Sequence, residues 1–278
     1  MRPKTRPYPR ILGLGDNTID TYLGAGLQFP GGNAVNVAVL CRRLGVDASY
    51  IGCLGEDEGG SILMEALIAE GVDVSRVRRI PGENARAKIM HEHGDRRFVG
   101  SKPGVRARYD FHDEDFVFVA QHDLVHTTIN SDLDDALARI ARSANRLSYD
   151  FSEKWTPERL ASTLPLIDFA FLSAPRRSDA ECEALLEQCL AYGTLTTVVT
   201  RGVDGTFARS RDRTCRQSAV PTRIVDTLGA GDGFVAGFLV AQLGGASLGE
   251  ACGAGAAYAA RVCTWQGAFG HARAWSAE

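Results

Sequence analysis

Three features are absent from the 278-residue sequence, and each would have indicated a particular class of protein. No stretch approaches the roughly 18 uninterrupted apolar residues that a membrane-spanning helix needs. No G-x-x-x-x-G-K-[ST] motif occurs, which argues against a P-loop NTPase. The seven cysteines include no C-x-x-C pair and have no histidine partner at metal-ligand spacing. Together these absences predict a soluble cytoplasmic protein whose thiols stay reduced.

A strong excess of charge is also absent. The net charge is −3 and the isoelectric point is near 6.1, so no general attraction to nucleic acid is expected and any anionic ligand must be held by a local site. With 45% hydrophobic and 23% charged residues, the chain suits one large α/β domain. We expect residues 11–278 to form this domain and residues 1–10, which contain four basic side chains and three prolines, to be a disordered lead.

Short apolar runs alternate with helical segments along the chain, a pattern typical of a mostly parallel sheet covered on both faces. Strands are predicted at residues 11–15, 49–54, 124–127, 146–150, 169–173 and 196–200. Helices are predicted at residues 33–44, 59–70, 131–144, 178–192, 233–243 and 247–260. Residues 85–100 differ: they alternate around a His93-Gly94-Asp95 turn, which predicts a β-hairpin.

The most informative segment is Asp226-Thr-Leu-Gly-Ala-Gly-Asp232, which precedes an apolar helix. Gly229, Ala230 and Gly231 leave their backbone N–H groups open to an anion at a helix N-terminus. With a phosphoryl group bound there, the carboxylate of Asp232 would reach an acceptor hydroxyl and act as general base. For Asp226 the simpler role of a helix N-cap is sufficient. For Asp232 that role would leave the two glycines unexplained.

This segment resembles the C-terminal signature of the ribokinase-like, PfkB-type carbohydrate kinases. Far upstream, Pro30-Gly-Gly-Asn33-Ala-Val-Asn36 and the residues up to Gly45 resemble the N-terminal signature of the same family. The resemblance implies a ribokinase-like three-layer α/β sandwich with a mostly parallel central sheet. It also implies a small β lid, from about residues 17–30 and 85–100, and a homodimer through the lid strands. ATP would be the co-substrate and Mg²⁺ the cofactor, while a requirement for K⁺ is left open.

The same resemblance assigns residues to the two substrates. The sugar site would comprise Asp16, Gly31, Gly32, Asn33 and Asn36. Asp16 directly follows the first predicted strand, and open α/β sheets place their ligands at the carboxyl ends of strands. Asn33 is also a suitable N-cap for the helix that follows, and the two roles are compatible. For ATP, the run from Val198 to Gly205 resembles the family's T-x-G-x-x-G turn through Thr200, Gly202 and Gly205, and Arg201 is a candidate phosphate ligand.

Two segments depart from the usual family pattern. The Asn-x-x-Glu motif that organises magnesium in many members is absent from residues 171–176. The usual Asp-x-Asn is replaced by Asp150-Phe-Ser152, which leaves Asp150 as the candidate metal contact, through water. The metal would then be held mainly by phosphates and water, as Mg²⁺ often is.

Among the family, the sequence looks close to bacterial kinases of fructosamines such as fructoselysine, on the segments at residues 15–17, 29–39, 150–155 and 171–175. That likeness implies transfer of the γ-phosphoryl group of ATP to a C6 hydroxyl. Another acceptor (fructose, a fructose phosphate, ribose or a nucleoside) and a non-catalytic sugar or nucleotide sensor remain as alternatives. A phosphorylated acceptor would need cationic groups. The candidates are Arg86, Lys88, Arg97 and Lys102.

Overall fold

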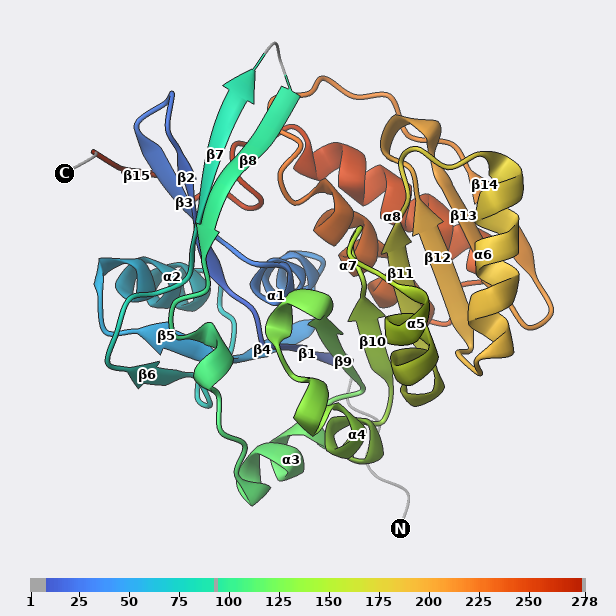
Figure 1. The fold of residues 1–278 in the computed structure, drawn as a ribbon, viewed down its shortest axis with the longest axis horizontal. Coiled ribbons are helices and arrows are strands. Elements are labelled where there is room, and N and C mark those ends of the chain that lie inside the picture. The colour runs from blue at the N-terminus through green and yellow to red at the C-terminus, as the bar shows by residue number, and fades with distance from the viewer. Residues whose placement is uncertain (1–8, 93–94, 277–278) are drawn as a thin grey trace.

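A computed structural model describes residues 9–92 and 95–276. Within them, an eight-stranded sheet has the order β14-β13-β12-β11-β10-β9-β1-β4 (Figure 1). Its strands are β1 (Arg10–Leu14), β4 (Asp47–Ile51), β9 (Leu124–Thr128), β10 (Leu147–Asp150), β11 (Phe169–Ser173), β12 (Thr196–Thr200), β13 (Thr206–Ser210) and β14 (Thr214–Gln217). All pairings from β4 to β12 are parallel, and only β13 and β14 are added antiparallel. The predicted mostly parallel sheet is therefore confirmed.

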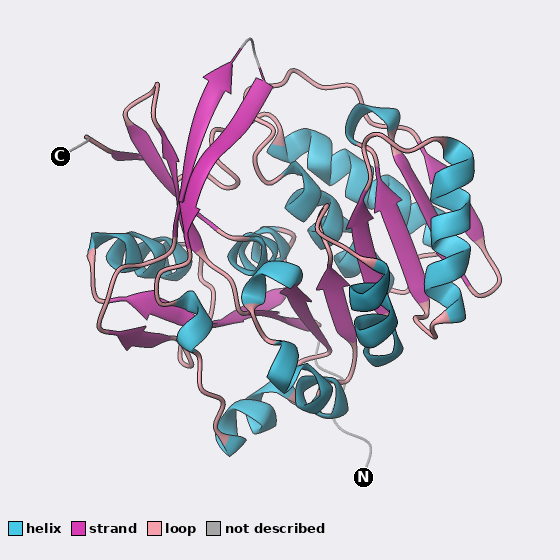
Figure 2. Cartoon of the chain, viewed as in Figure 1, coloured by secondary structure: helices cyan, strands magenta, loops and turns pink. Residues whose placement is uncertain are grey.

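Helices cover both faces of this sheet and make three layers, as Figure 2 shows by secondary structure. One core lies under α1 (Asn33–Arg43), α2 (Glu58–Ala69), α7 (Ala230–Leu243) and α8 (Leu248–Val262). The other lies under α3 (Asp113–Val119), α4 (Asp134–Ser143), α5 (Pro157–Thr163) and α6 (Asp179–Ala191). Side chains alternate between the two faces along each strand, so Ile11 joins the first core and Leu12 the second.

A second sheet stands beside α1 and α2 in Figure 1 and has the order β15-β3-β2-β7-β8. We call it the small sheet; its strands are β2 (Thr18–Tyr22), β3 (Leu27–Gly31), β7 (Arg86–Glu92), β8 (Asp95–Lys102) and β15 (Arg273–Ala274). β7 and β8 pair antiparallel, which confirms the predicted hairpin, although His93 and Gly94 of its turn lie outside the described residues. Two further short strands, β5 (Cys53–Gly55) and β6 (Arg78–Ile80), pair with each other.

Several element boundaries differ from the prediction for local reasons. The single strand expected at residues 49–54 is two strands, because β5 leaves the central sheet after Gly52 and pairs with β6. The helix expected from residue 131 begins only at Asp134, since Asp132 is left-handed with φ of 54°. Most of the predicted disordered lead lies outside the described residues, and its last residue, Arg10, already belongs to β1.

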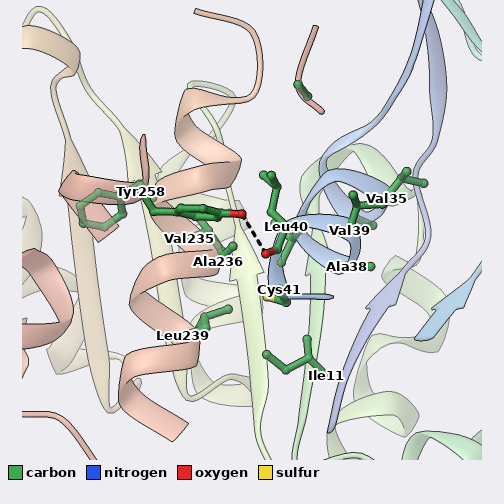
Figure 3. Packing of buried hydrophobic residues seen from close by; sticks show 14 of the residues in the cluster. Ile11, Val35, Ala38, Val39, Leu40, Cys41, Val235, Ala236, Leu239 and Tyr258 are labelled. Carbon is green, nitrogen blue, oxygen red and sulfur yellow. Dashed lines mark hydrogen bonds between the residues drawn. The ribbon is translucent and has the colours of Figure 1, made fainter. Parts of the chain in front are cut away.

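The helices α1 and α7 pack against each other although they are far apart in the chain (Figure 3). Val35 and Val39 of α1 belong to the same buried cluster as Val235 and Leu239 of α7. Tyr258 on α8 adds a hydrogen bond from its hydroxyl to the carbonyl oxygen of Leu40, at 3.2 Å. This packing fixes the first turns of α1 and α7 relative to each other.

No helix within the described part of the chain combines the length and the apolar character needed to cross a membrane.

Candidate active site

The first turns of α1 and α7 meet at the carboxylate of Asp232. Asn33 donates from Nδ2 to Asp232 Oδ1 at 2.7 Å, and Asn36 donates from Nδ2 to Asp232 Oδ2 at 2.5 Å. The two asparagines are three residues apart on one helix and so lie on the same face. The structure thus brings together two residues predicted to bind sugar and the residue predicted to be the base.

A second carboxylate joins this site from the end of β10. Asp150 accepts a hydrogen bond at Oδ2 from the same Asn33 Nδ2, at 2.8 Å, and another at Oδ1 from the backbone N–H of Ser152, at 2.7 Å. One amide group therefore bridges two carboxylates.

Both carboxylates bind protons more tightly than an exposed aspartate. Burial, together with the nearby charges of Asp150 and Asp16, raises the pKa of Asp232 to about 7, although the hydrogen bonds from Asn36 and Asn33 oppose the shift. Burial likewise raises the pKa of Asp150 to about 6. A carboxylate with a pKa near neutrality is suited to accept a proton during a reaction.

Asp16 caps α1 from outside the helix. Its two carboxylate oxygens accept hydrogen bonds from the backbone N–H groups of Asn33 and Ala34, each at 3.0 Å. The interpretation of Asn33 as a side-chain N-cap is wrong: Gly32 occupies the N-cap position, and the side chain of Asn33 points to the two carboxylates instead. Burial raises the pKa of Asp16, although these two backbone hydrogen bonds oppose the shift.

The two glycines before Asn33 allow a close approach of two chain segments. Gly32 has a φ of 104°, and a Cβ atom there would lie 2.4 Å from the Cα of Asn17. At Gly31 a Cβ would lie 2.2 Å from Oδ2 of Asp20. The turn therefore requires glycine for steric reasons.

The turn before α7 leaves backbone N–H groups without an acceptor among the described residues. Gly229 is the left-handed N-cap, with φ of 78°, and the N–H of Ala230 already donates to the carbonyl oxygen of Thr227 at 3.2 Å. The N–H of Gly231 has no acceptor among the described residues, and the space beside its Cα is empty to 4 Å. Of the three residues predicted to face an anion, Gly231 offers the clearest donor at a helix N-terminus.

Asp226 has a different role from the predicted N-cap of α7. Its carboxylate accepts hydrogen bonds from the N–H groups of Leu228 at 2.9 Å and Gly267 at 3.0 Å, and from the hydroxyl of Tyr22 at 2.5 Å. Because Tyr22 lies on β2, Asp226 ties the small sheet to the turn that leads into α7.

The predicted ATP-binding turn follows β12. Thr200 ends that strand and pairs in register with Ser173, so the turn lies at the same edge of the sheet as Asp150. Gly202 and Gly205 both have positive φ, 59° and 86°. The guanidinium of Arg201 binds the carbonyl oxygen of Arg177 and the carboxylate of Asp179, each at 2.9 Å, so protein groups already hold it.

Of the candidate ligands for a phosphorylated acceptor, Arg86 and Lys102 are held by other protein groups. Arg86 donates to Gln28 Oε1 at 3.0 Å and lies 3.8 Å from Asp57, while the exposed Lys102 pairs with Glu83 at 3.5 Å. Lys88 is exposed on β7. Arg97 lies outside the residues whose side chains are described.

The donor set fits a magnesium ion that is shared with phosphates. Within the described residues, no group of three or more histidine, cysteine, aspartate or glutamate side chains could enclose a metal. Asp150 and Asp232, however, both lie within 2.8 Å of the same Asn33 nitrogen. Mg²⁺ is commonly bound by one or two carboxylates together with substrate phosphates and water, and Asp150 can serve as such a carboxylate.

One buried residue of this site, His126, was not predicted from the sequence. Its Nε2 lies 2.7 Å from Oδ1 of Asn33, and its Nδ1 lies 3.0 Å from Oγ of Ser148. The available signal was a histidine inside the apolar run at residues 124–127, where a polar ring needs partners.

The three-layer α/β fold with its mostly parallel central sheet is that of the ribokinase-like class of ATP-dependent sugar kinases. The chain belongs to this class through the pfkB family of carbohydrate kinases, whose model matches residues 19–272.

Individual relatives agree with that assignment. The fructosamine kinase FrlD of Bacillus subtilis (strain 168) is 38% identical over 266 residues, 94% of this chain and 93% of the relative. The fructoselysine 6-kinase of Escherichia coli (strain K12) is 36% identical over 256 residues, 92% of this chain and 98% of the relative. Among solved structures, Arabidopsis thaliana ribokinase complexed with ribose and ATP superposes with a TM-score of 0.82 at 21% identity, covering 94% of this chain and 95% of that one. The predicted family and fold are therefore confirmed.

Proposed function

We propose that this kinase transfers the γ-phosphoryl group of ATP to the C6 hydroxyl of a fructosamine such as fructoselysine, with Asp232 as general base. The observation that carries the proposal is the Asp232 carboxylate, which Asn33 and Asn36 hold at the start of α7 and whose pKa burial raises to about 7. The relatives named for fructosamine and fructoselysine, at 38% and 36% identity, support the substrate class.

In the proposed reaction, Asp232 accepts the proton of the acceptor hydroxyl as its oxygen attacks the γ-phosphorus. The bond from that phosphorus to the bridging oxygen breaks, and ADP leaves with the bond's electron pair. The N–H of Gly231 and the positive end of the α7 dipole stabilise charge on the transferring group. Positioning and electrostatics account for most of the acceleration in phosphoryl transfer.

Bound Mg²⁺ would neutralise phosphate charge, and Asp150 is the residue we propose to hold it, through water. Asp150 keeps lone pairs for this contact because, among the described residues, each of its oxygens accepts one hydrogen bond.

The sugar is proposed to bind between Asp16 and Asp232. Asp16 is nearly fully buried and keeps a free lone pair on each oxygen after capping α1. Oδ1 of Asn36 is buried without a hydrogen-bond partner among the described residues, and a sugar hydroxyl would satisfy it. The backbone of Gly31 and Gly32 would line the same site, while Thr200, Gly202 and Gly205 would face ATP.

An ADP-release assay with Mg-ATP tests the acceptor. The panel contains fructoselysine, other fructosamines, fructose, fructose phosphates, ribose and nucleosides. Turnover confined to fructosamines would support the proposal. Turnover on another acceptor would keep the kinase activity and refute the substrate class, and binding without any turnover would favour a sensor.

The variant Asp232→Asn tests the base. Removing a general base typically lowers turnover about 10²–10⁴-fold, and we expect this loss in kcat while sugar binding is retained. Asp135→Asn is the matched control, because Asp135 is an exposed aspartate in the first turn of α4. Near-normal turnover of Asp232→Asn would remove the assignment.

A further inference from the structure

His126 forms a buried hydrogen-bonded chain with two neighbours. It lies on β9 directly opposite Ser148 of β10, and both side chains are fully buried. The imidazole Nδ1 lies 3.0 Å from Oγ of Ser148, and Nε2 lies 2.7 Å from Oδ1 of Asn33. These hydrogen bonds therefore connect Ser148, through His126, to the side-chain amide of Asn33, which contacts both site carboxylates.

The carboxylates determine which way the amide of Asn33 points. Its Nδ2 lies 2.8 Å from Asp150 and 2.7 Å from Asp232. With both carboxylates ionised, which is the state in which Asp232 can accept a proton, a turned-over amide would place its oxygen at hydrogen-bond distance from two carboxylate oxygens, and all three would be acceptors. The NH₂ group must therefore face the carboxylates, and the carbonyl oxygen must face His126.

That orientation fixes the tautomer of the imidazole. The oxygen of Asn33 needs a donor, so Nε2 of His126 carries the hydrogen and Nδ1 accepts from the Ser148 hydroxyl. Burial also lowers the pKa of His126 to about 3, so the ring stays neutral near neutral pH.

We propose that His126 is a positioning residue of the kinase reaction: its Nε2–H holds the Asn33 amide in the one orientation that keeps Asp232 and Asp150 in place for phosphoryl transfer. The proposal rests on the proposed role of Asp232 as base. His126 itself does not touch the reacting atoms.

Two variants separate a hydrogen-bond role from simple filling of the core. The amide nitrogen of His126→Gln can occupy the position of Nε2 and donate to Asn33. His126→Asn ends near the position of Nδ1 and leaves the Asn33 oxygen without a donor. Misplacement of a reacting group by about 1 Å can cost 10²-fold in rate. We therefore expect kcat to fall about 10²-fold in His126→Asn, with the KM for ATP unchanged, and to recover to within about tenfold of wild type in His126→Gln.

The assay uses whichever acceptor the wild-type protein phosphorylates, so a failure of the fructosamine proposal does not affect this comparison. His122→Asn is the control, because His122 is also a fully buried histidine bonded to a serine, Ser49, but makes no contact with the site carboxylates. We expect it to change stability and to leave kcat per folded molecule unchanged. Equal kcat losses in His126→Gln and His126→Asn would overturn the proposal.

Nitrogen-15 NMR of histidine-labelled wild-type protein provides a readout that is independent of turnover. Two-bond ring correlations assign the protonated nitrogen of His126, with His126→Gln identifying its signals. A neutral ring with hydrogen on Nε2 is expected between about pH 6 and 8. Hydrogen on Nδ1, or a charged ring, would refute the proposal even if no acceptor were found.

Discussion

Single residues in this site shift the pKa values of the two carboxylates in opposite directions. Burial and mutual repulsion favour their protonated forms, and the amides of Asn33 and Asn36 favour the charged form of Asp232. The balance leaves its pKa near 7, where a carboxylate is ionised for a substantial fraction of the time and still accepts a proton readily. An exposed aspartate would be a much weaker base.

The raised pKa of Asp232 predicts a loss of activity in acid. As the proposed base, Asp232 must be ionised, so kcat/KM should fall as the pH is lowered through about 7, approaching a tenfold loss per pH unit on the acid side. The measurement is kcat/KM for the acceptor from about pH 5.5 to 8.5.

Asp150→Asn should move the midpoint of that curve to lower pH, because the charge of Asp150 raises the pKa of Asp232. A lower kcat in this variant would not affect the comparison, because the pH at the midpoint of the kcat/KM curve does not depend on its maximum value. An unchanged midpoint would show that the two carboxylates are not electrostatically coupled.

Residue types in the sequence predicted the main residues of the site, whereas their contacts depend on segments that only the fold brings together. Asp232, Asn33 and Asn36 were identified from sequence and meet in the structure. The side-chain partners of Asn33 depend on strands β9 and β10, more than 90 residues away, and no local pattern reports them. For the same reason the capping of α1 was assigned to Asn33, whereas Asp16 performs it from the loop after β1.

Among the elements, buried strands were predicted most closely. The bounds of β11 and β12 match the prediction because each is a short run of β-formers buried between two layers. The start of α7 was predicted three residues late, since the left-handed Gly229 allows the helix to begin at Ala230. The antiparallel strands β13 and β14 were missed because neither contains a long apolar run: β13 buries only the short apolar pair Phe207 and Ala208, and β14 is polar and exposed or half-buried.

The turn into α1 gives a prediction for a single element. Gly32→Ala should destabilise the protein by about 2–4 kcal/mol, since it combines a positive φ with a Cβ placed 2.4 Å from the Asn17 backbone. Gly45→Ala is the matched control: its φ is 90°, yet nothing lies within 4 Å of the added Cβ, so only about 1–2 kcal/mol is expected. Urea unfolding of both variants measures the difference, and equal losses would rule out the steric explanation.

At the scale of the whole molecule, the small sheet is the part we propose to act as a lid and dimer contact. Its outer strand β8 carries the exposed side chain of Val99, and the adjacent β7 carries that of Met90. Exposed apolar side chains on a sheet edge are common at sites of association.

Sedimentation equilibrium tests the dimer. We expect the wild-type protein to sediment at twice its chain mass of 29.9 kDa, and Val99→Lys to shift it toward the monomer because a charge would be buried at the interface. Val117→Lys on α3 is the control, since Val117 is equally apolar and 62% exposed but lies on another element. A monomeric wild-type protein would refute the proposed dimer.

The hydrogen bond between Asn33 and Asp232 joins residues that are 199 positions apart in the sequence, so the ribosome makes the two partners at different times. At typical translation rates of about 5–20 residues per second, about 10–40 s separate the emergence of α1 from that of α7. Until then the face of α1 that packs on α7 lacks its partner, and the growing chain has neither the proposed base nor the proposed phosphate-binding turn. If Asp232 is the base as proposed, an unfinished chain therefore cannot phosphorylate its acceptor, and the apolar side chains of α1 that pack on α7 stay uncovered until α7 emerges.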